Sequence, residues 1–576
     1  MMGKVAAVGV SLILVVGVIV GVIASVSHNN SGNGAPAAST SSSGLSAGMK
    51  AVQTICAPTD YKEACISSLT PVAQNGTNVT PKVLLQAAFE ATMTEVNKAL
   101  DKSGSIGKGY SNDAIQKMAM EDCDELLKFA IDELQASISM VGDNDMHTIS
   151  DRAAEFQNWL SAVISYQQTC LDGITNPELK SAMTNGLLNA TQFTSNALAV
   201  VGEITDFLKT FNIPLPLNTS SITNSIHSRR LLETNVDNKG YPNWLSAGDR
   251  RLLASSNNRA RPNAVVAKDG SGQFKTISAA IEAYPKNHRG RYVIYVKAGV
   301  YDEYIIITKE KVNIFMYGDG PRKTIVTGRK SNAGGYSTFR TATFSAIAAG
   351  FICKSMGFQN TAGPEGHQAV ALRVQSDMAV FFNCRMDGYQ DTLYTQAHRQ
   401  FYRNCVISGT VDFIFGDASV VIQNSLIIAR KPMDNQKNTV TAHGRSERHE
   451  TTGLIIHNCR IVPEQKLFAA RFKTPTYLGR PWKEYSRTVV MESTLGDFIN
   501  PKGWLPWAGN FALDTLFYAE YANRGQGAVT TRRVQWKGYK VITNKREAQQ
   551  FTVAPFIQGN LWLKYAGVPY LPGLKR

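Results

Sequence analysis

Hydrophobic residues recur at three- and four-residue steps through the first third of the chain. The pattern runs through LLQAAFEATMTEVNKAL, AIQKMAMEDCDELLKFAIDELQASISMV, ISDRAAEFQNWLSAVISYQQTCLDGI and ALAVVGEITDFL. Because this spacing matches the turn of an α-helix, each segment presents one apolar stripe. Several such helices with short joins predict an all-α four-helix bundle over residues 47–210.

The pattern changes after residue 261 to short runs rich in Val, Ile, Tyr and Phe. Runs such as RYVIYVKAGVYDEYIII and VNIFMYGDG are broken every dozen residues or so by Gly, Asn or Asp. This texture indicates all-β structure over residues 262–576. We expect a single helix in its first part, over Ile277–Ala283, covering the hydrophobic end of the β-domain.

An internal repeat decides which β-architecture to expect. A shift of 21 residues places Asn383 and Cys384 on Asn404 and Cys405. Similar Asn-containing segments return at 423–427 and 457–461. A repeat of this length is typical of one turn of a solenoid, in which like residues stack on like. A β-sandwich does not require a sequence repeat of this kind, so a parallel β-helix is favoured.

The same shift carries Asp391 onto Asp412. Neighbouring strands in a sheet lie about 4.8 Å apart, so stacking predicts two adjacent carboxylates. It also predicts a disulfide between Cys384 and Cys405. The repeat therefore marks a candidate dyad and a covalent link at once.

The N-terminal segment has no charged residue from Val5 to Ser27. About 20 apolar residues can span a bilayer, so residues 1–28 are interpreted as a signal anchor, with a cleaved signal peptide as the alternative. Both send the chain into the secretory pathway. A low-complexity linker follows at 29–46. Glycosylation acceptor motifs, which fit a secreted glycoprotein, begin at Asn29, Asn75, Asn78, Asn189 and Asn218.

The two halves of the chain have opposite charge. Residues 29–228 carry 11 Lys and Arg against 20 Asp and Glu, whereas residues 229–576 carry 48 against 25. The halves could bind each other, or each surface could be solvated separately, and the basic half would attract a polyanion. Nucleic acid is disfavoured as that polyanion, because no nucleic-acid-binding motif is present and the chain is secreted.

Residues 211–261 lack periodicity and contain one tetrapeptide twice, Arg-Arg-Leu-Leu. The two dibasic pairs are Arg229–Arg230 and Arg250–Arg251. Exposed linkers are where proteases cut, so we interpret this segment as a linker with two processing sites.

Four cysteines lie in the helical region. Cys56 and Cys65 bracket a short loop, and Cys123 and Cys170 lie on different predicted helices. In a secreted protein the pairs 56–65 and 123–170 are favoured. Spacing alone leaves the other two connectivities open.

The four-cysteine helical region, residues 47–210, resembles the plant invertase and pectin methylesterase inhibitor domain. The resemblance implies that the bundle inhibits an enzyme. A bundle that only assists folding or retention is the alternative.

Residues 262–574 closely resemble the plant pectin methylesterases through four segments in the right order. These segments are GPEGHQAVALR from Gly363, GYQDTLY from Gly388, GTVDFIFG from Gly409 and YLGRPW from Tyr477. The likeness implies a right-handed parallel β-helix, hydrolysis of pectin methyl esters to methanol and pectate in the cell wall, and a zymogen. In that family the Arg-Arg-Leu-Leu motif marks separation of the pro-region, so a subtilisin-like protease and separate inhibitor proteins are expected partners.

Chemistry can be assigned on the residues that match. Two close carboxylates cannot both stay charged cheaply, so one holds a proton. Arg480, by the family match, would keep Asp412 ionised, which makes Asp412 the nucleophile and Asp391 the proton donor and acceptor. The mechanism implies a covalent acyl intermediate.

The remaining site residues bind substrate or stabilise charge. The amides of Gln390 and Gln368 suit the oxyanion. Trp482 offers a flat face for a sugar ring, and the family match adds Thr338 and Arg480 to substrate binding. Neither a metal nor a cofactor is expected, because no His/Cys cluster has ligand spacing.

Three features depart from the family pattern. Asp417 stands where the family usually has an amide, His443 replaces a usual Gln, and residues 446–453 form an unusual loop. We expect them to affect the pH optimum and the substrate subsites rather than the catalytic set.

Two other hypotheses for the function remain. A β-helix polysaccharide hydrolase or lyase would also use acidic residues, and a binding protein would use the β-helix only for docking to the wall. Methanol release without chain shortening separates the first from an esterase. If charge holds the enzyme on pectate, wall binding falls with salt.

Overall fold

The computed structural model describes residues 45–75, 79–110, 112–211 and 262–575. The predicted anchor, both Arg-Arg-Leu-Leu sites and three of the glycosylation acceptors (Asn29, Asn78 and Asn218) lie outside the described residues. In the part of the chain that is described, no helix is long and apolar enough to cross a bilayer.

The helical region is built on four long helices that pack side by side, α4, α5, α7 and α8. Their apolar stripes meet in one core, where Phe89 stacks on Phe156 with ring centroids 5.5 Å apart. Side chains cap the ends of the helices. At the start of α5, for example, Asp113 accepts the backbone N–H groups of Ile115 and Gln116. The helices are α2 (Ala47–Cys56), α3 (Lys62–Asn75), α4 (Pro81–Gly107), α5 (Ala114–Asp143), α6 (Met146–Asp151), α7 (Ala153–Gly173), α8 (Pro177–Gly202) and α9 (Ile204–Thr210).

Both predicted disulfides of this region are present. Cys56–Cys65 ties the end of α2 to α3, and Cys123–Cys170 ties α5 to α7. The connectivity that spacing left open is therefore settled by which helices lie next to each other.

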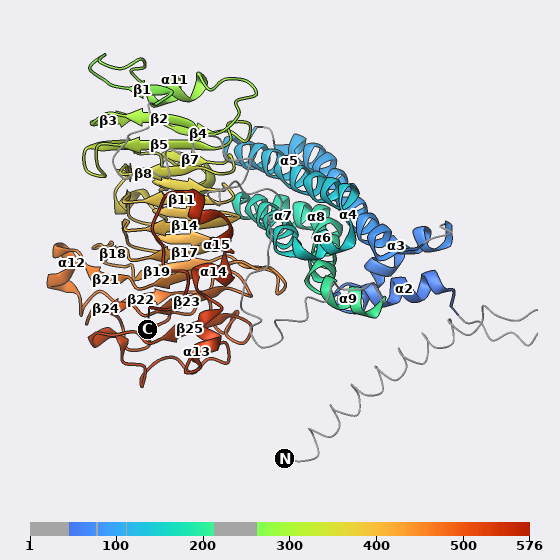
Figure 1. Ribbon diagram of the computed structural model, residues 1–576. Helices are drawn as coiled ribbons and strands as arrows, with labels where there is room; N and C mark the ends of the chain where they lie inside the picture. The colour runs from blue at the N-terminus through green and yellow to red at the C-terminus, as the bar shows by residue number, and fades with distance from the viewer. Residues whose placement is uncertain (1–44, 76–78, 111, 212–261, 576) are drawn as a thin grey trace, which may run out of the picture. The chain divides into compact units, whose positions relative to one another are not determined.

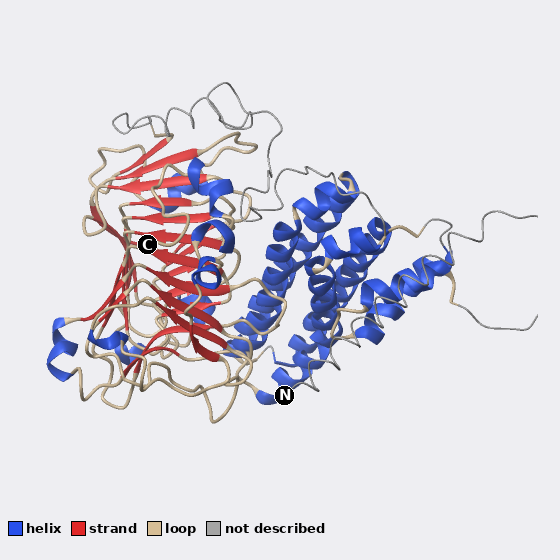
Figure 2. Ribbon diagram, turned by 60° about the horizontal axis from the view of Figure 1, so that its bottom comes forward, coloured by secondary structure: helices blue, strands red, loops and turns tan. Residues whose placement is uncertain are grey.

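The second region is a parallel β-helix, whose strands stack turn upon turn (Figures 1 and 2). Three parallel sheets form its walls. The first contains β1 (Ala264–Val266), β2 (Tyr292–Val296), β5 (Ile314–Gly318), β8 (Ile352–Lys354), β11 (Ala379–Phe382), β14 (Arg399–Arg403), β17 (Ser419–Gln423), β20 (Gly453–His457), β23 (Arg487–Met491), β25 (Phe517–Tyr521) and β26 (Tyr539–Val541). The second contains β3 (Gly299–Asp302), β6 (Thr324–Gly328), β9 (Gly357–Asn360), β12 (Arg385–Asp387), β15 (Val406–Gly409), β18 (Leu426–Ala429), β21 (Arg460–Pro463) and β24 (Thr494–Leu495). The third, which we call the site sheet, contains β4 (Ile305–Ile307), β7 (Phe344–Ala346), β10 (Leu372–Val374), β13 (Leu393–Thr395), β16 (Ile414–Gly416), β19 (Asn438–His443) and β22 (Thr476–Gly479).

Short helices accompany the β-helix. The predicted helix is α11 (Ile277–Glu282), which packs on β1 and β4 at the N-terminal end of the stack. The others are α12 (Gln465–Ala470), α13 (Lys545–Gln549), α14 (Val553–Phe556) and α15 (Gly559–Trp562).

The 21-residue repeat is the register of the stack. Leu372 pairs with Leu393 and Leu393 with Ile414, each step covering 21 residues. The repeated Asn marks one corner of four turns: Asn383, Asn404, Asn424 and Asn458 all have φ between 52° and 53°. Asn tolerates this left-handed conformation better than most residues. The Asn side chain of one turn also contacts the next, since Asn458 Nδ2 donates to Asn424 Oδ1 at 2.7 Å.

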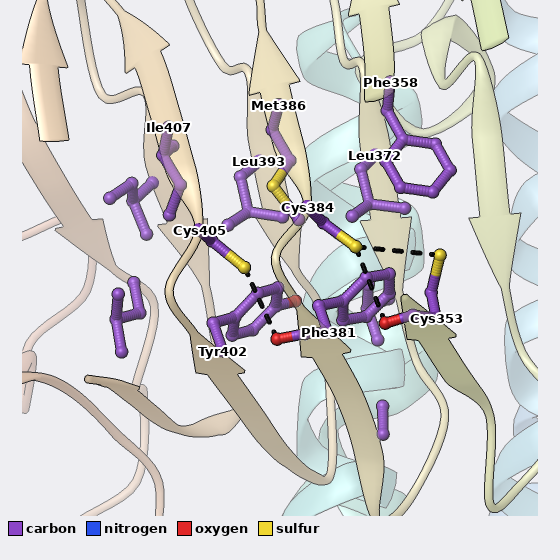
Figure 3. Packing of buried hydrophobic residues seen from close by; sticks show 14 of the residues in the cluster. Cys353, Phe358, Leu372, Phe381, Cys384, Met386, Leu393, Tyr402, Cys405 and Ile407 are labelled. Atoms are coloured by element: carbon purple, nitrogen blue, oxygen red, sulfur yellow. Dashed lines mark hydrogen bonds between the residues drawn. The ribbon is translucent and has the colours of Figure 1, made fainter. Parts of the chain in front are cut away.

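The predicted Cys384–Cys405 disulfide is wrong. Both thiols are free and buried, as are those of Cys353 and Cys459. In Figure 3 the sulfur of Cys384 points toward Cys353, with the two Sγ atoms 3.8 Å apart, and Cys405 points toward the carbonyl of Phe381. The stacking itself is as expected. Side chains that project in parallel from stacked turns keep the strand spacing of about 4.8 Å between their Cβ atoms, and a disulfide needs about 3.8 Å.

Candidate active site

The two aspartates of the repeat lie at a corner where the chain enters the site sheet. Asp391 comes two residues before β13 and Asp412 two residues before β16, which pairs with β13. Both have left-handed backbones, with φ of 63° and 50°. Strained conformations of this kind cluster at functional sites. The repeat therefore places two acidic side chains on adjacent turns in the same unusual geometry.

Asp412 is held by three donors. Arg480 donates from Nε to Oδ1 at 2.8 Å and from Nη2 to Oδ2 at 2.6 Å. The hydroxyl of Thr439 donates to Oδ1 at 2.6 Å and accepts the backbone N–H of Asp412 at 2.8 Å. A bidentate guanidinium with an added hydroxyl stabilises the ionised carboxylate and fixes its orientation. Both carboxylate oxygens of Asp412 are thus held in place.

The surroundings of Asp391, in contrast, disfavour a negative charge on its carboxyl group. Burial, with the negative charge of Asp412 as a second cause, raises the pKa of Asp391 well above its usual range, although the positive charge of Arg480 opposes the shift. Only 7% of Asp391 is exposed. The two carboxyls therefore have different surroundings: Asp391 is buried with a raised pKa, and Asp412 is bound through both oxygens to Arg480.

A cavity of about 530 Å³ opens in front of the pair. Every predicted catalytic or substrate-binding residue contributes to its wall: Thr338, Gln368, Gln390, Asp391, Asp412, Arg480 and Trp482. The structure thus gathers residues that lie up to 144 positions apart in the chain, from Thr338 to Trp482.

Some wall residues were missed by sequence reasoning. The guanidinium carbon of Arg480 lies 4.2 Å from the ring centroid of Trp507, and Phe415 meets Trp482 edge-on at 5.9 Å. Gly503 and Trp504 also match the resembled family, and Trp507 lies three residues after Trp504, so its nearness to a matched pair was the available signal. Trp504 itself is fully buried in the β-helix core. Thr439 gave no signal, because a Thr in a β-strand is ordinary.

Helices of the bundle complete the cavity. Ile115 and Asp122 of α5 and Thr169 and Asp172 of α7 line the same space as the aspartates. Tyr166 donates to or accepts from Nε2 of the buried His398 at 3.1 Å.

Ion pairs join the acidic bundle to the basic β-helix, as the charge asymmetry of the sequence allows. The carboxylate of Asp122 contacts Nε of Arg340, and that of Asp172 contacts Nζ of Lys483, each at 2.5 Å. Glu121 lies 3.1 Å from Arg340, and Asp132 accepts from Lys309 at 3.0 Å. In all four, the acid belongs to the bundle and the base to the β-helix.

A second groove, of about 570 Å³, lies on the sheet that contains β12 and β15. Its arginines are engaged locally, Arg385 with Asp387 at 2.5 Å and Arg430 with Glu464 at 3.4 Å. The two carboxylates of this groove, Asp387 and Glu464, are thus both paired with arginines.

Among the described residues, one group has atoms close enough to share a metal ion: Asp60, Glu447 and His449. Arg448 already forms an ion pair with Asp60, and His449 Nδ1 lies 2.6 Å from Glu447 Oε1. The group is thus engaged in internal ion pairs and lies apart from the lining of the catalytic cavity.

Asn189 is the one predicted acceptor whose side chain is described. It is exposed on α8, and its amide donates to Glu95 Oε2 at 3.2 Å. The side chain of Asn75, the last residue of α3, is not described. Glycosylation at these positions stays a prediction.

Comparisons with known proteins agree with this architecture. The pectinesterase family model matches residues 263–560, and the model of the plant invertase/pectin methylesterase inhibitor family matches residues 50–200. "Probable pectinesterase/pectinesterase inhibitor 13" of Arabidopsis thaliana is 46% identical over 528 residues, which cover 91% of this chain and 82% of that protein. "Pectinesterase 1" of Citrus sinensis is 42% identical over 91% of this chain and 88% of its own length.

A solved structure matches the β-helix. "Pectin methylesterase from Carrot" is 53% identical, with a TM-score of 0.55, and the match covers 55% of this chain and 99% of the carrot chain. The chain therefore belongs to the pectinesterase family: it is a carboxylic ester hydrolase, a pectin methylesterase on a parallel β-helix, preceded by an inhibitor-like helical domain.

Proposed function

We propose that the chain hydrolyses methyl esters of pectin through a covalent acyl-enzyme. Asp412 attacks the ester carbonyl carbon and forms an anhydride, while the proton of Asp391 passes to the departing methoxide to give methanol. Water then attacks the anhydride, Asp391 takes its proton, and the free acid leaves with Asp412 regenerated. Side-chain amides of Gln368 and Gln390 stabilise the oxyanion in both steps.

One observation carries this proposal. Asp412 has both carboxylate oxygens bound to Arg480, whereas the neighbouring Asp391 is buried with a raised pKa. A nucleophile must be ionised and a general acid must be protonated at the same pH. The corner of the β-helix supplies both states within one cavity, and Trp482 and Thr338 line it where the polymer would lie.

The first test replaces each aspartate by its amide. Asp412→Asn should abolish methanol release, and Asp391→Asn should reduce it by at least about a hundredfold, the usual contribution of a positioned acid. The matched control is Asp434→Asn, because Asp434 is almost fully exposed on the same β-helix. Methanol is measured together with the chain length of the pectin.

The outcome separates the candidate functions. Shortened chains would point to a polysaccharide hydrolase or lyase. Unchanged binding to cell walls with no turnover in the wild type would point to a binding protein. Methanol release that survives Asp412→Asn would refute the nucleophile.

The bundle is proposed to inhibit the enzyme until it is removed. Support comes from Asp122 and Asp172, which line the cavity in front of the catalytic pair and pair with cations of the β-helix. A polymer cannot occupy the space that α5 and α7 fill. Cutting at Arg229–Arg230 or Arg250–Arg251 by a subtilisin-like protease would then release the β-helix into the cell wall, where its excess of basic residues would hold it on pectate. Separate inhibitor proteins would bind the same face.

Adding the bundle back tests the inhibition. Full-length chain cut in the 211–261 linker is separated into its two parts, and methanol release is measured with increasing amounts of the helical part. The proposal requires a saturable loss of activity. A helical part that leaves the rate unchanged would instead support a role in folding or retention.

A further inference from the structure

A second pair of buried carboxyls lies behind the substrate face, outside the catalytic set. Asp417 follows β16, and Glu450 lies in the loop between β19 and β20. Only 4% of Asp417 and 1% of Glu450 are exposed. His443, the last residue of β19, lies beside them. The cluster thus brings together the three features that depart from the family pattern, from Asp417 to Glu450, 33 residues later in the chain.

Each carboxyl is anchored through one oxygen only. Asp417 Oδ1 accepts the hydroxyl of Thr452 at 2.7 Å. Glu450 Oε1 accepts the backbone N–H groups of Ser446 at 3.1 Å and Glu447 at 2.7 Å. Asp417 Oδ2 and Glu450 Oε2 are buried without a donor among the described residues. The two carboxyls lie within hydrogen-bonding range of each other.

A single proton would satisfy both unpartnered oxygens. Burial raises the pKa of Asp417 to about 6. Burial, followed by the charge of Asp417, raises the pKa of Glu450 well above its usual range. Two like-charged carboxyls in contact behave in this way, because one proton between them removes the repulsion and makes a strong hydrogen bond.

The neighbouring histidine cannot supply that proton. His443 Nδ1 accepts the backbone N–H of Arg487 at 3.1 Å, which assigns the ring proton to Nε2, 3.9 Å from Asp417 Oδ1. Burial, aided by Arg487 and Arg445, keeps the pKa of His443 well below its usual range. The ring therefore stays neutral. The charged or titratable groups that face the pair are Tyr394, His443, Arg445, Glu447, Lys483 and Arg487 from the β-helix, and Asp172 from α7 through Lys483.

The loop that carries Glu450 supports Trp482. A Cβ added to Gly444 would lie 2.9 Å from the indole ring of Trp482, so the loop backbone packs directly against that ring. Arg445 ties the loop together by donating to the carbonyls of Glu450 at 3.0 Å and Tyr485 at 3.2 Å. Asp417, Gly444 and Trp482 also line one small cavity. The pair thus lies directly behind the aromatic wall of the substrate cavity.

We propose that Asp417 and Glu450 share one proton and act as positioning residues, holding the 444–452 loop against Trp482 so that pectin binding depends on pH. The proposal rests on the esterase function. With one proton, the pair carries one negative charge beside Arg445. Loss of that proton leaves two buried negative charges in contact, which pushes the loop away and removes the support of Trp482. Turnover would change less, since Asp391 and Asp412 precede the paired strands β13 and β16, whereas Asp417 follows β16.

The test uses Asp417→Asn and Glu450→Gln in the full chain, because an amide keeps the shape and supplies the hydrogen without titrating. Asp434→Asn is again the exposed control. First, the thermal midpoint of the full chain is measured from pH 5 to pH 8. Second, after cleavage in the linker and removal of the helical part, KM and kcat for methyl-esterified pectin are measured over the same range.

In the wild type the thermal midpoint should fall and KM should rise about three- to tenfold toward pH 8, the scale of one coupled pair, with a smaller change in kcat. Both amide variants should lose most of the KM rise and part of the fall in midpoint. An unchanged pH dependence of the midpoint in both variants would overturn the shared proton. A changed midpoint with an unchanged KM profile would overturn the link to Trp482. The midpoint reports on the pair even if the chain proves to have no esterase activity.

Discussion

At the scale of single residues, the site depends on how two identical side chains acquire different charge states. Asp391 and Asp412 occupy equivalent positions on successive turns, yet Arg480 and Thr439 contact only Asp412. Asp391 is left buried beside a negative charge. The difference between their surroundings therefore comes from neighbours supplied by β19 and by the segment after β22, not from the aspartates themselves.

This asymmetry predicts a pH-dependent stability difference. Asp391→Asn should make the chain more stable than the wild type at pH 7 and leave it nearly equal at pH 4. The folded state keeps a proton that the unfolded state releases above about pH 4, so wild-type stability falls as pH rises toward the raised pKa of Asp391. The difference should grow by up to about 1 kcal/mol per pH unit.

Urea unfolding at both pH values, followed by a signal of the β-helix, checks this expectation. A variant that is less stable than the wild type at pH 7 would show that Asp391 is ionised in the folded protein. Asp434→Asn serves as the exposed control here as well.

At the scale of elements, the corners of the β-helix explain the repeat. The Asn ladder fixes one corner in a left-handed conformation, and the aspartates use the same geometry at another corner. The free thiols are buried in the β-helix core, where burial raises the pKa of Cys353 and Cys405, and that of Cys459 to about 12. They act as small apolar groups rather than as covalent links.

The cysteine arrangement predicts a count of labelled thiols. Four of the eight cysteines should react with an alkylating reagent after denaturation without reductant, and all eight after reduction. The unlabelled four are Cys56, Cys65, Cys123 and Cys170. Peptide mass spectrometry identifies them. If only two thiols were labelled, with Cys384 and Cys405 protected, these two cysteines would form a disulfide between stacked turns after all.

At the scale of the whole molecule, charge divides the chain into an acidic bundle and a basic enzyme. The ion pairs between them follow this division, with Asp122 and Asp172 nearest the catalytic cavity. Truncating one partner of such a pair leaves a cation without its partner, which weakens association more than the loss of an exposed ion pair.

The interface predicts a specific weakening of inhibition. Asp122→Asn combined with Asp172→Asn should raise the concentration of helical part needed for half inhibition by at least about tenfold. Asp206→Asn is the matched control, because Asp206 pairs with Lys209 inside α9. Methanol release at low and high salt provides the measurement, and inhibition should also weaken as salt rises. Equal inhibition by the double variant and the control would contradict a charge-based interface.

The sequence by itself predicted the two architectures, the stacking register and the residues that line the candidate site. Helical periodicity and a 21-residue repeat are local properties, and a solenoid turns a repeat directly into neighbours in space. The Cys384–Cys405 error shows the limit of this reasoning, because register places residues side by side but does not set the direction of their side chains.

Only the tertiary structure decided which groups share an electrostatic environment. Thr439 and Trp507 join the site, and Asp417 meets Glu450, through folding that brings distant segments together. Burial and the distance between charges control a pKa, and neither is a property of sequence order. For this reason the pair of aspartates and their expected roles could be found in the sequence and its family match, whereas the burial that raises the pKa of Asp391 required the fold.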